Sequence, residues 1–154
     1  MRLIAVGRRM PAWARTACDD YLRRLKGGLP VGLLEIEPAA RTAGGDARTA
    51  IAAEGRRLLG ALLPGDHVVT LDERGRELST RELAAWLNTR MQQGEDLAFV
   101  IGGPDGLAQE VLARGNFTLS LSRLTLPHAL VRVLLAEQLY RAHGILSHHP
   151  YHRD

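Results

Sequence analysis

The sequence predicts an α/β fold in which a mostly parallel sheet is covered by helices on both faces. Short runs of aliphatic and β-branched residues alternate along the chain with helical patterns, and strands that alternate with helices form parallel sheets. The chain has 154 residues, of which 45% are hydrophobic. It is long enough to bury one core and short for two ordinary domains. We therefore expect a single domain over residues 1–154.

The five predicted strands are aliphatic runs of four to six residues, bounded by glycine, proline or polar residues. Short apolar runs of this kind are typical of strands that are buried in a parallel sheet. In chain order they are Leu3–Val6, Val31–Ile36, His67–Leu71, Leu97–Ile101 and Phe117–Leu121.

The five predicted helices have recognisable start and stop signals. Pro11 suits the first turn of a helix, where a backbone N–H is not needed. Ser79 and Glu82 form a capping box, in which each side chain accepts a hydrogen bond from the backbone N–H of the other residue. Gly144 marks the end of the last helix. In chain order the helices are Pro11–Leu25, Ala47–Leu63, Ser79–Gln93, Gly106–Arg114 and Pro127–His143.

The composition excludes several classes of protein. Cys18 is the only cysteine, so neither an intramolecular disulfide nor a Cys-x-x-Cys metal site can form. The apolar runs are far shorter than the ~20 residues that cross a bilayer, and the amino end lacks the longer apolar stretch of a signal peptide. We therefore expect a cytoplasmic protein that does not cross a membrane.

Positive charge is concentrated near the amino terminus. The whole chain has a formal net charge of +3, whereas residues 1–26 hold seven Lys or Arg side chains against only Asp19 and Asp20. A segment of this kind could contact a polyanion such as RNA. The solvated face of an amphipathic helix carries the same pattern, so both interpretations stay open.

Three turns are expected at the carboxyl edge of the sheet, where ligands bind parallel sheets. Leu71-Asp72 follows the third predicted strand, and Gly102-Gly103 follows the fourth, where missing side chains let the backbone approach a ligand. Residues 118–128 lead from the fifth strand into the last helix. Neither the G-x-G-x-x-G dinucleotide motif nor a P-loop is present, which disfavours dehydrogenases and P-loop enzymes.

The last predicted helix is apolar around most of its circumference. A helix of this kind is buried on more than one side, either within the core or against a partner subunit. On the second interpretation, Leu134 and Leu135 lie at a homodimer interface. Glu137 and Arg141 are four residues apart, a spacing that is typical of a helix salt bridge and also fits a functional pair.

The carboxyl terminus is aromatic and basic. Tyr151 and Arg153 suit stacking on bases and contact with phosphate. His148, His149 and His152 lie close together, but neighbouring histidines fit one metal ion poorly. No metal is expected.

Eight segments together form a distinctive pattern, of which Leu124-Thr-Leu-Pro-His128 and His149-Pro-Tyr-His-Arg153 are the most specific. This pattern resembles the bacterial ribosomal RNA large-subunit methyltransferase H family over the whole chain, although Ala129 stands where the family has a second proline. The resemblance implies a SPOUT methyltransferase, an α/β domain with a carboxyl-terminal trefoil knot that works as a homodimer. The other segments are Val6-Gly7, Tyr21-Leu-Arg-Arg24, Thr70-Leu-Asp72, Ile101-Gly-Gly-Pro-Asp-Gly106, Leu130-Val-Arg-Val133 and Glu137-Gln-Leu-Tyr-Arg141.

The resemblance also implies a reaction, the transfer of a methyl group from S-adenosyl-L-methionine to N3 of a pseudouridine in 23S rRNA. The resemblance implies that the substrate of this reaction is the assembled ribosome. Arg123 is expected to contribute its backbone rather than its side chain. The cofactor contacts fall on the three turns described above, at Leu71, Gly103, Ser122, Arg123, Leu124, Thr125, Leu126 and Pro127.

The same resemblance suggests the catalytic residues. His128 and Glu137 are candidates for handling the N3 proton or orienting the base. Arg141 and Arg153 are candidates for stabilising negative charge or holding phosphate, and Tyr151 for stacking on the base. We expect the carboxyl-terminal tail to complete the active site, within one chain or across the dimer.

Two other functions fit the residues. One is a different cofactor enzyme with a flavodoxin-like sheet, which would bind a phosphate-bearing ligand at the same turns. The other is a non-catalytic ribosome- or RNA-associated module that uses the basic amino-terminal helix.

Overall fold

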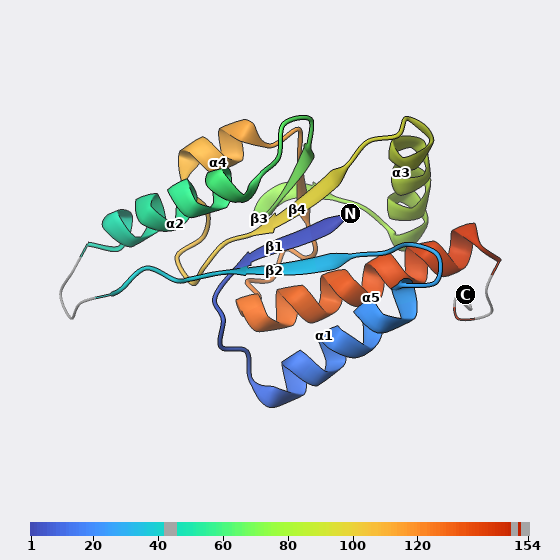
Figure 1. Ribbon diagram of the computed structural model, residues 1–154, viewed down its shortest axis with the longest axis horizontal. Coiled ribbons are helices and arrows are strands. Elements are labelled where there is room, and N and C mark those ends of the chain that lie inside the picture. The colour runs from blue at the N-terminus through green and yellow to red at the C-terminus, as the bar shows by residue number, and fades with distance from the viewer. Residues whose placement is uncertain (42–45, 149–150, 152–154) are drawn as a thin grey trace.

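The computed structural model describes residues 1–41, 46–148 and 151, which form one α/β domain around a five-stranded sheet (Figure 1). The strands lie in the order β2-β1-β4-β3-β5, and every neighbouring pair is parallel. The predicted parallel sheet is therefore confirmed. The elements are β1 (Arg2–Val6), α1 (Ala12–Leu25), β2 (Gly32–Ile36), α2 (Ala47–Ala61), β3 (His67–Glu77), α3 (Thr80–Gln92), β4 (Leu97–Ile101), α4 (Gln109–Arg114), β5 (Phe117–Ser120) and α5 (His128–Leu146).

Helices cover both faces of the sheet, as predicted. Alternate residues of one strand point to opposite faces, so Leu3 and Ile4 of β1 belong to two different cores. Leu3 packs with Phe99 in the core beneath α1, α3 and α5, and Ile4 packs with Leu58 in the core beneath α2 and α4. Figure 1 shows α1 and α5 together on one side of the sheet and α2 and α4 on the other.

Strand β3 continues to Glu77, whereas the sequence predicts its end at Leu71. The extension is polar, and it is a strand because it pairs with β5, where Arg76 lies opposite Leu119 after a break in register that follows Leu71. Gly75 makes this approach possible, because a Cβ atom there would lie 2.7 Å from the backbone of Leu119. The extension positions residues 72–74 beside the candidate site.

Two helix ends also differ from the prediction. Helix α4 begins at Gln109 instead of Gly106, because Gly106 closes a turn in which its N–H donates to the carbonyl oxygen of Gly103 at 3.0 Å. Helix α5 continues through Gly144 to Leu146. Gly144 is buried inside the helix, and His148, with φ of 55°, takes the left-handed conformation that glycine usually provides after a helix.

Helix α5 packs against α1 on one side and α3 on the other. Leu135 is fully buried in this core, so the expectation that it lies at a subunit interface is wrong. Leu130 and Leu134, one helical turn apart, remain partly exposed. Most of the helix is therefore buried within the core of its own chain. A narrow apolar strip on its outer side remains accessible to a partner.

Candidate functional site

A pocket of about 770 Å³ opens at the carboxyl edge of β3, β4 and β5. Three chain segments form its walls: the start of the β3 extension, the double-glycine turn after β4, and the loop between β5 and α5. These are the three turns that the sequence singles out, and they meet because parallel strands end at the same edge of the sheet. The lining residues are 71–74, 101–107, Gln109, Leu112, Leu119, Leu121, Ser122, 124–128 and Val131.

Most of the predicted cofactor contacts lie together in this pocket. Arg123 does not line it: its side chain is 89% exposed, and its Nε donates to a carboxylate oxygen of Glu77 at 3.0 Å. The residues that the structure brings together at the pocket are Leu71, Gly103, Ser122, Leu124, Thr125, Leu126 and Pro127, with His128 beside them.

The loop between β5 and α5 is held by its own polar side chains. Ser122 Oγ accepts a hydrogen bond from the Leu124 backbone N–H at 2.9 Å, and Ser120 Oγ donates to the Ser122 carbonyl oxygen at 3.0 Å. Thr125 Oγ1 donates to Glu73 Oε2 at 3.1 Å, which ties the loop to the β3 extension. These hydrogen bonds fix the backbone of the loop that forms this side of the pocket. The Leu124 side chain is exposed.

The double-glycine turn is closely packed at both glycines, against backbone at Gly102 and against the end of the Glu54 side chain at Gly103. A Cβ atom on Gly102 would lie 2.6 Å from the Gly106 carbonyl oxygen, and one on Gly103 would lie 2.7 Å from Glu54 Oε2. Gly106 has a φ of +86°, in the left-handed region. The sequence indicates a tight turn here, and the structure adds that the backbone of Gly103 rests on a buried carboxylate.

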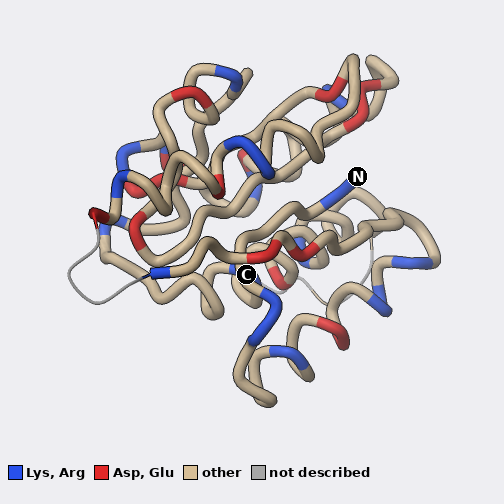
Figure 2. Tube along the Cα trace, turned by 60° about the vertical axis from the view of Figure 1, so that its left-hand side comes forward, with Lys and Arg blue, Asp and Glu red and all other residues tan. Residues whose placement is uncertain are grey.

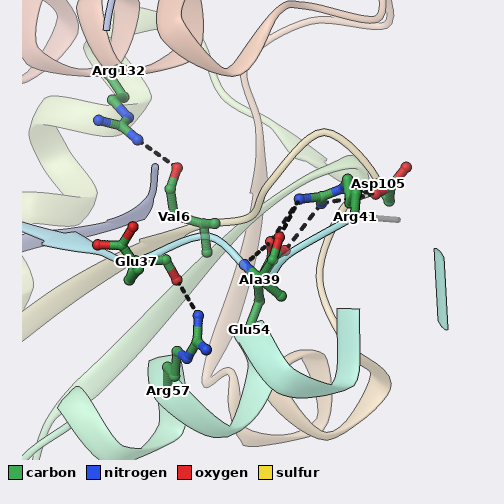
Figure 3. Close-up of polar contacts among 8 residues, drawn as sticks. All are labelled: Val6, Glu37, Ala39, Arg41, Glu54, Arg57, Asp105 and Arg132. Atoms are coloured by element: carbon green, nitrogen blue, oxygen red, sulfur yellow. Dashed lines mark hydrogen bonds and ion pairs between the residues drawn. The ribbon is translucent and has the colours of Figure 1, made fainter. Parts of the chain in front are cut away.

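That carboxylate belongs to a polar cluster behind the turn, which sequence analysis did not identify. Glu54 on α2 is only 2% exposed, and its Oε1 accepts from the Ala39 N–H and from Arg41 Nη1, both at 3.0 Å. Arg41 also donates from Nε to Asp105 Oδ2 at 2.9 Å. Figure 3 shows Arg41 between Glu54 and Asp105. Asp105 in turn lines the pocket.

His128 begins α5 at the edge of the pocket. Its pKa is lowered from the usual value of 6.5, mainly by burial and then by the positive charges of Arg132 and Arg41, against a smaller opposing effect of Glu54. The imidazole is therefore neutral at neutral pH, and a neutral imidazole can accept a proton.

Glu137, Arg141 and Tyr151 form a second group, separate from the pocket. Arg141 donates from Nε and Nη2 to Glu137 Oε1 at 2.9 and 2.6 Å, and its guanidinium lies 5.0 Å from the centre of the Tyr151 ring. Glu137 lies nine residues after His128, which is roughly 13 Å along a helix. One chain therefore does not bring the two groups together. Arg153 lies outside the described residues.

Comparison with known proteins identifies the family. A family model described as a predicted SPOUT methyltransferase matches residues 1–152. The chain belongs to the SPOUT methyltransferases. Among them, it is 53% identical over 154 residues to ribosomal RNA large subunit methyltransferase H of Thiobacillus denitrificans, covering 100% of this chain and 99% of that protein. It is 51% identical to the protein of the same name from Xanthomonas campestris, covering 99% and 97% of the two chains.

A solved structure supports the SPOUT methyltransferase fold. A probable methylase family protein from Haemophilus influenzae superimposes with a TM-score of 0.55 over 99% of this chain and 70% of that one. Its sequence identity is 13%, so the likeness concerns the fold alone.

Five of the seven basic side chains in the amino-terminal segment of this SPOUT methyltransferase form ion pairs within the chain, and two of them share one carboxylate. Figure 2 shows basic and acidic residues interspersed along the trace. Pairing of this kind leaves less free positive charge than the sequence indicates, which disfavours the RNA-binding module as the main function. The pairs are Arg2 with Asp66, Arg8 with Glu37, Arg15 with Glu35, and both Arg23 and Arg24 with Asp20.

Over residues 1–41, 46–148 and 151, no three His, Cys, Asp or Glu side chains gather in a way that could hold a metal ion. Within the same ranges, no helix is both long and apolar enough to span a bilayer. His149 and His152 lie outside these ranges.

Proposed function

We propose that this SPOUT methyltransferase transfers a methyl group from S-adenosyl-L-methionine to N3 of a pseudouridine in 23S rRNA, on the assembled ribosome. The observation that carries the proposal is that Leu71, Gly103, Ser122 and residues 124–127, to which the family resemblance assigns the cofactor, line one pocket. Relatives that match nearly the whole chain are named for ribosomal RNA of the large subunit, which supports the substrate class.

The residues at the pocket fit S-adenosylmethionine. The volume of the pocket lies within the range of roughly 300 to 1,000 Å³ that is usual for small-molecule sites. Leu71, Leu119 and Leu126 provide apolar surface that suits an adenine ring, and Asp72 and Glu73 provide negative charge that suits a sulfonium and an ammonium group. When bound, the cofactor supplies an activated methyl group.

His128 is suited to handle the proton of the target base. Methylation of an imide nitrogen requires the loss of its proton, and a base near the reacting atoms assists this loss. The neutral imidazole of His128 borders the pocket and can accept that proton. The lowered pKa also keeps His128 from adding positive charge beside a cationic cofactor.

We further propose that the active form is a homodimer and that the carboxyl-terminal group of one copy reaches the pocket of the other. Glu137 and Arg141 lie too far along α5 to act at the pocket of their own chain, and Tyr151, which follows the helix, packs against Arg141. The partly exposed Leu130 and Leu134 form an apolar strip through which a second α5 would pack. Arg153 would then hold a phosphate or the cofactor carboxylate, because a guanidinium binds such groups with two parallel hydrogen bonds.

The proposal extends to the organisation and location of the protein. Residues 1–154 would form one SPOUT domain whose carboxyl-terminal part threads a trefoil knot. A substrate on the assembled ribosome places the protein in the cytoplasm. No step of the proposed reaction requires a metal ion.

A methylation assay tests the proposed function. Ribosomes from a strain that lacks the modification are incubated with the protein and radiolabelled S-adenosylmethionine, and the methylated nucleotide is located by mass spectrometry. Whole ribosomes should be methylated faster than isolated large subunits or naked 23S rRNA, because a small chain has little surface for reading sequence. Equal rates on all three substrates would contradict the ribosome as the substrate.

Calorimetric titration separates the proposed enzyme from its alternatives. Binding of S-adenosylmethionine at micromolar concentration supports the methyltransferase. Strong binding of ribosomal RNA without any binding of the cofactor would instead indicate a non-catalytic module.

A further inference from the structure

We propose that the Arg41–Glu54 ion pair is a positioning device that holds the double-glycine turn, residues 102–106, in the shape that binds the cofactor. The proposal rests on the proposed function, and it assigns a role to two residues that do not line the pocket themselves.

Glu54 is a costly residue to place where it lies. It is only 2% exposed on α2, and a buried carboxylate is tolerated only when it is paired and hydrogen-bonded. The pairing is specific: Oε1 accepts from the Ala39 N–H and from Arg41 Nη1, each at 3.0 Å, and Oε2 lies 3.4 Å from Arg41 Nη2. A helix that needed only to pack would be served by an apolar side chain at this position.

The ion pair contacts the double-glycine turn at two points. First, Gly103 rests directly on it: a Cβ atom at Gly103 would lie 2.7 Å from Glu54 Oε2 and 3.3 Å from Arg41 Nη2. Second, Arg41 holds Asp105 from Nε at 2.9 Å and from Nη2 at 2.8 Å. The turn is therefore held beneath Gly103 and at Asp105, whose contact with Arg41 is drawn in Figure 3.

This arrangement determines the geometry of one pocket wall. Gly103 and Asp105 both line the pocket, and the side chains of Arg41 and Glu54 lie directly behind them. Arg41 carries one positive charge and pairs with both Glu54 and Asp105, so this cluster keeps an excess of negative charge, to which Asp72 and Glu73 add elsewhere in the lining. The ion pair thus sets the positions of the Gly103 backbone and of the Asp105 side chain.

The structure requires an arginine at position 41. One guanidinium contacts Glu54 and Asp105 simultaneously from different nitrogen atoms. A lysine ammonium is a compact point charge and lacks this planar arrangement of donors. Arg41 also contributes to the lowered pKa of His128 across the pocket, which shows that its charge is felt at the site.

The first test compares Arg41→Met and Arg41→Lys with the matched control Arg57→Met. Arg57 donates to the Glu37 carbonyl oxygen at 2.6 Å and so anchors the same segment to α2 without contacting the turn. Calorimetry should show that Arg41→Met binds S-adenosylmethionine about tenfold more weakly, the effect of one lost charge-assisted contact. Arg41→Lys should recover only part of this loss, and Arg57→Met should bind like the wild type. At saturating cofactor and at a pH above the acid limb of the rate profile, kcat should stay within about twofold of the wild type, since Arg41 does not contact the reacting atoms.

Hydrogen exchange provides a readout that does not depend on the cofactor. Exchange at the amides of residues 102–106 should accelerate in Arg41→Met and not in Arg57→Met, whether or not ligand is present. If the wild type fails to bind S-adenosylmethionine, the proposed function fails, and this measurement still decides the positioning role. Unchanged exchange and unchanged affinity in Arg41→Met, or equal effects in Arg57→Met, would overturn it.

A double-mutant cycle tests the contact with Gly103 directly. Gly103→Ala should weaken cofactor binding in the wild-type background, because the added methyl group meets Glu54 Oε2. In a Glu54→Ala background the same substitution should cost less. Thermal unfolding checks that each variant folds. Glu54→Gln, which keeps the shape of the side chain, serves as the milder replacement if Glu54→Ala does not fold. Strictly additive effects would show that Glu54 does not support the turn.

Discussion

The Arg132 guanidinium on α5 donates a hydrogen bond of 2.7 Å to the carbonyl oxygen of Gly7, immediately after β1. The same group donates to the Val6 carbonyl oxygen at 2.5 Å and to Glu35 Oε1 at 2.9 Å. Arg132 is only 1% exposed, and burial lowers its pKa against the opposing effect of Glu35. One buried cation therefore fastens the last helix to the first two strands.

Replacing Arg132 by methionine should destabilise the fold by about 3 kcal/mol, because it leaves two carbonyl groups without their partner and leaves Glu35 with only the longer contact to Arg15. Urea unfolding measures the change. Arg123→Met is the matched control, because Arg123 is exposed and its surface ion pair contributes less than about 1 kcal/mol. Similar midpoints for the two variants would show that the buried contacts of Arg132 do not stabilise the fold.

The methylation rate should decrease at low pH as His128 becomes protonated. Burial, Arg132 and Arg41 lower the pKa of His128, so the acid limb of the rate profile should lie below pH 6.5. Arg41→Met removes a positive charge that disfavours protonation, so the pKa of His128 and the acid limb should both move to higher pH. NMR titration of the imidazole and a pH–rate profile measure the two effects. An acid limb that does not follow the NMR pKa would exclude His128 as the base.

Tyr151 should act as a neutral aromatic ring. A hydrogen bond with Tyr21, followed by burial, raises the pKa of Tyr151 to about 12, so its phenol stays protonated at any working pH. If the ring stacks on a base, Tyr151→Phe should retain most of the methylation activity, and Tyr151→Ala should lose about tenfold or more, since one base–aromatic stack contributes roughly 1 to 3 kcal/mol. Equal losses in kcat/KM for ribosomes would instead indicate that the hydroxyl is essential.

Arg153 should act at the site of the partner copy. Arg153→Ala should reduce methylation about ten- to a hundredfold while the melting temperature hardly changes, because the residue follows the last helix. A mixed dimer then carries Arg153→Ala on one chain and Gly103→Val on the other. Sharing across subunits leaves one intact site, so about half of the activity should remain. An inactive mixed dimer would show that the tail acts within its own chain.

Leu134 and Leu135 should respond differently to a charge. Leu134 is partly exposed on the outer side of α5, whereas Leu135 is fully buried. Leu134→Glu should therefore give a folded monomer, and Leu135→Glu should prevent stable folding because it buries an unpaired carboxylate. Light scattering and circular dichroism distinguish these outcomes. A monomeric wild type at micromolar concentration would contradict the proposed dimer.

Much of the fold and of the pocket could be predicted from local patterns. The strand Leu97–Ile101 was predicted with its observed ends, because an apolar run between turn residues is a local signal. The pocket could be predicted because strands that are all parallel end at one edge of the sheet. The polar extension of β3 could not be predicted, because it is a strand only through its pairing with β5, which lies far along the chain.

The polar interior of the protein could not be predicted in the same way. Glu54 and Arg132 each stand in a helical sequence where a charged residue usually faces solvent. Their burial depends on partners far along the chain: Glu35 lies 97 residues from Arg132. Whether Glu137 and Arg141 meet the pocket depends on a second copy, which no local pattern describes.

The position of α5 also bears on how the protein is made. A growing chain leaves the ribosome with its amino terminus first, so β1 and α1 emerge long before α5. Until residues 128–146 are available, Leu3 and Phe99 lack the helix that covers them, and Arg132 cannot reach Gly7. An unfinished chain therefore exposes one apolar face of the sheet, a condition that favours aggregation or chaperone binding. This face of the sheet stays incompletely covered until the last helix has emerged from the ribosome.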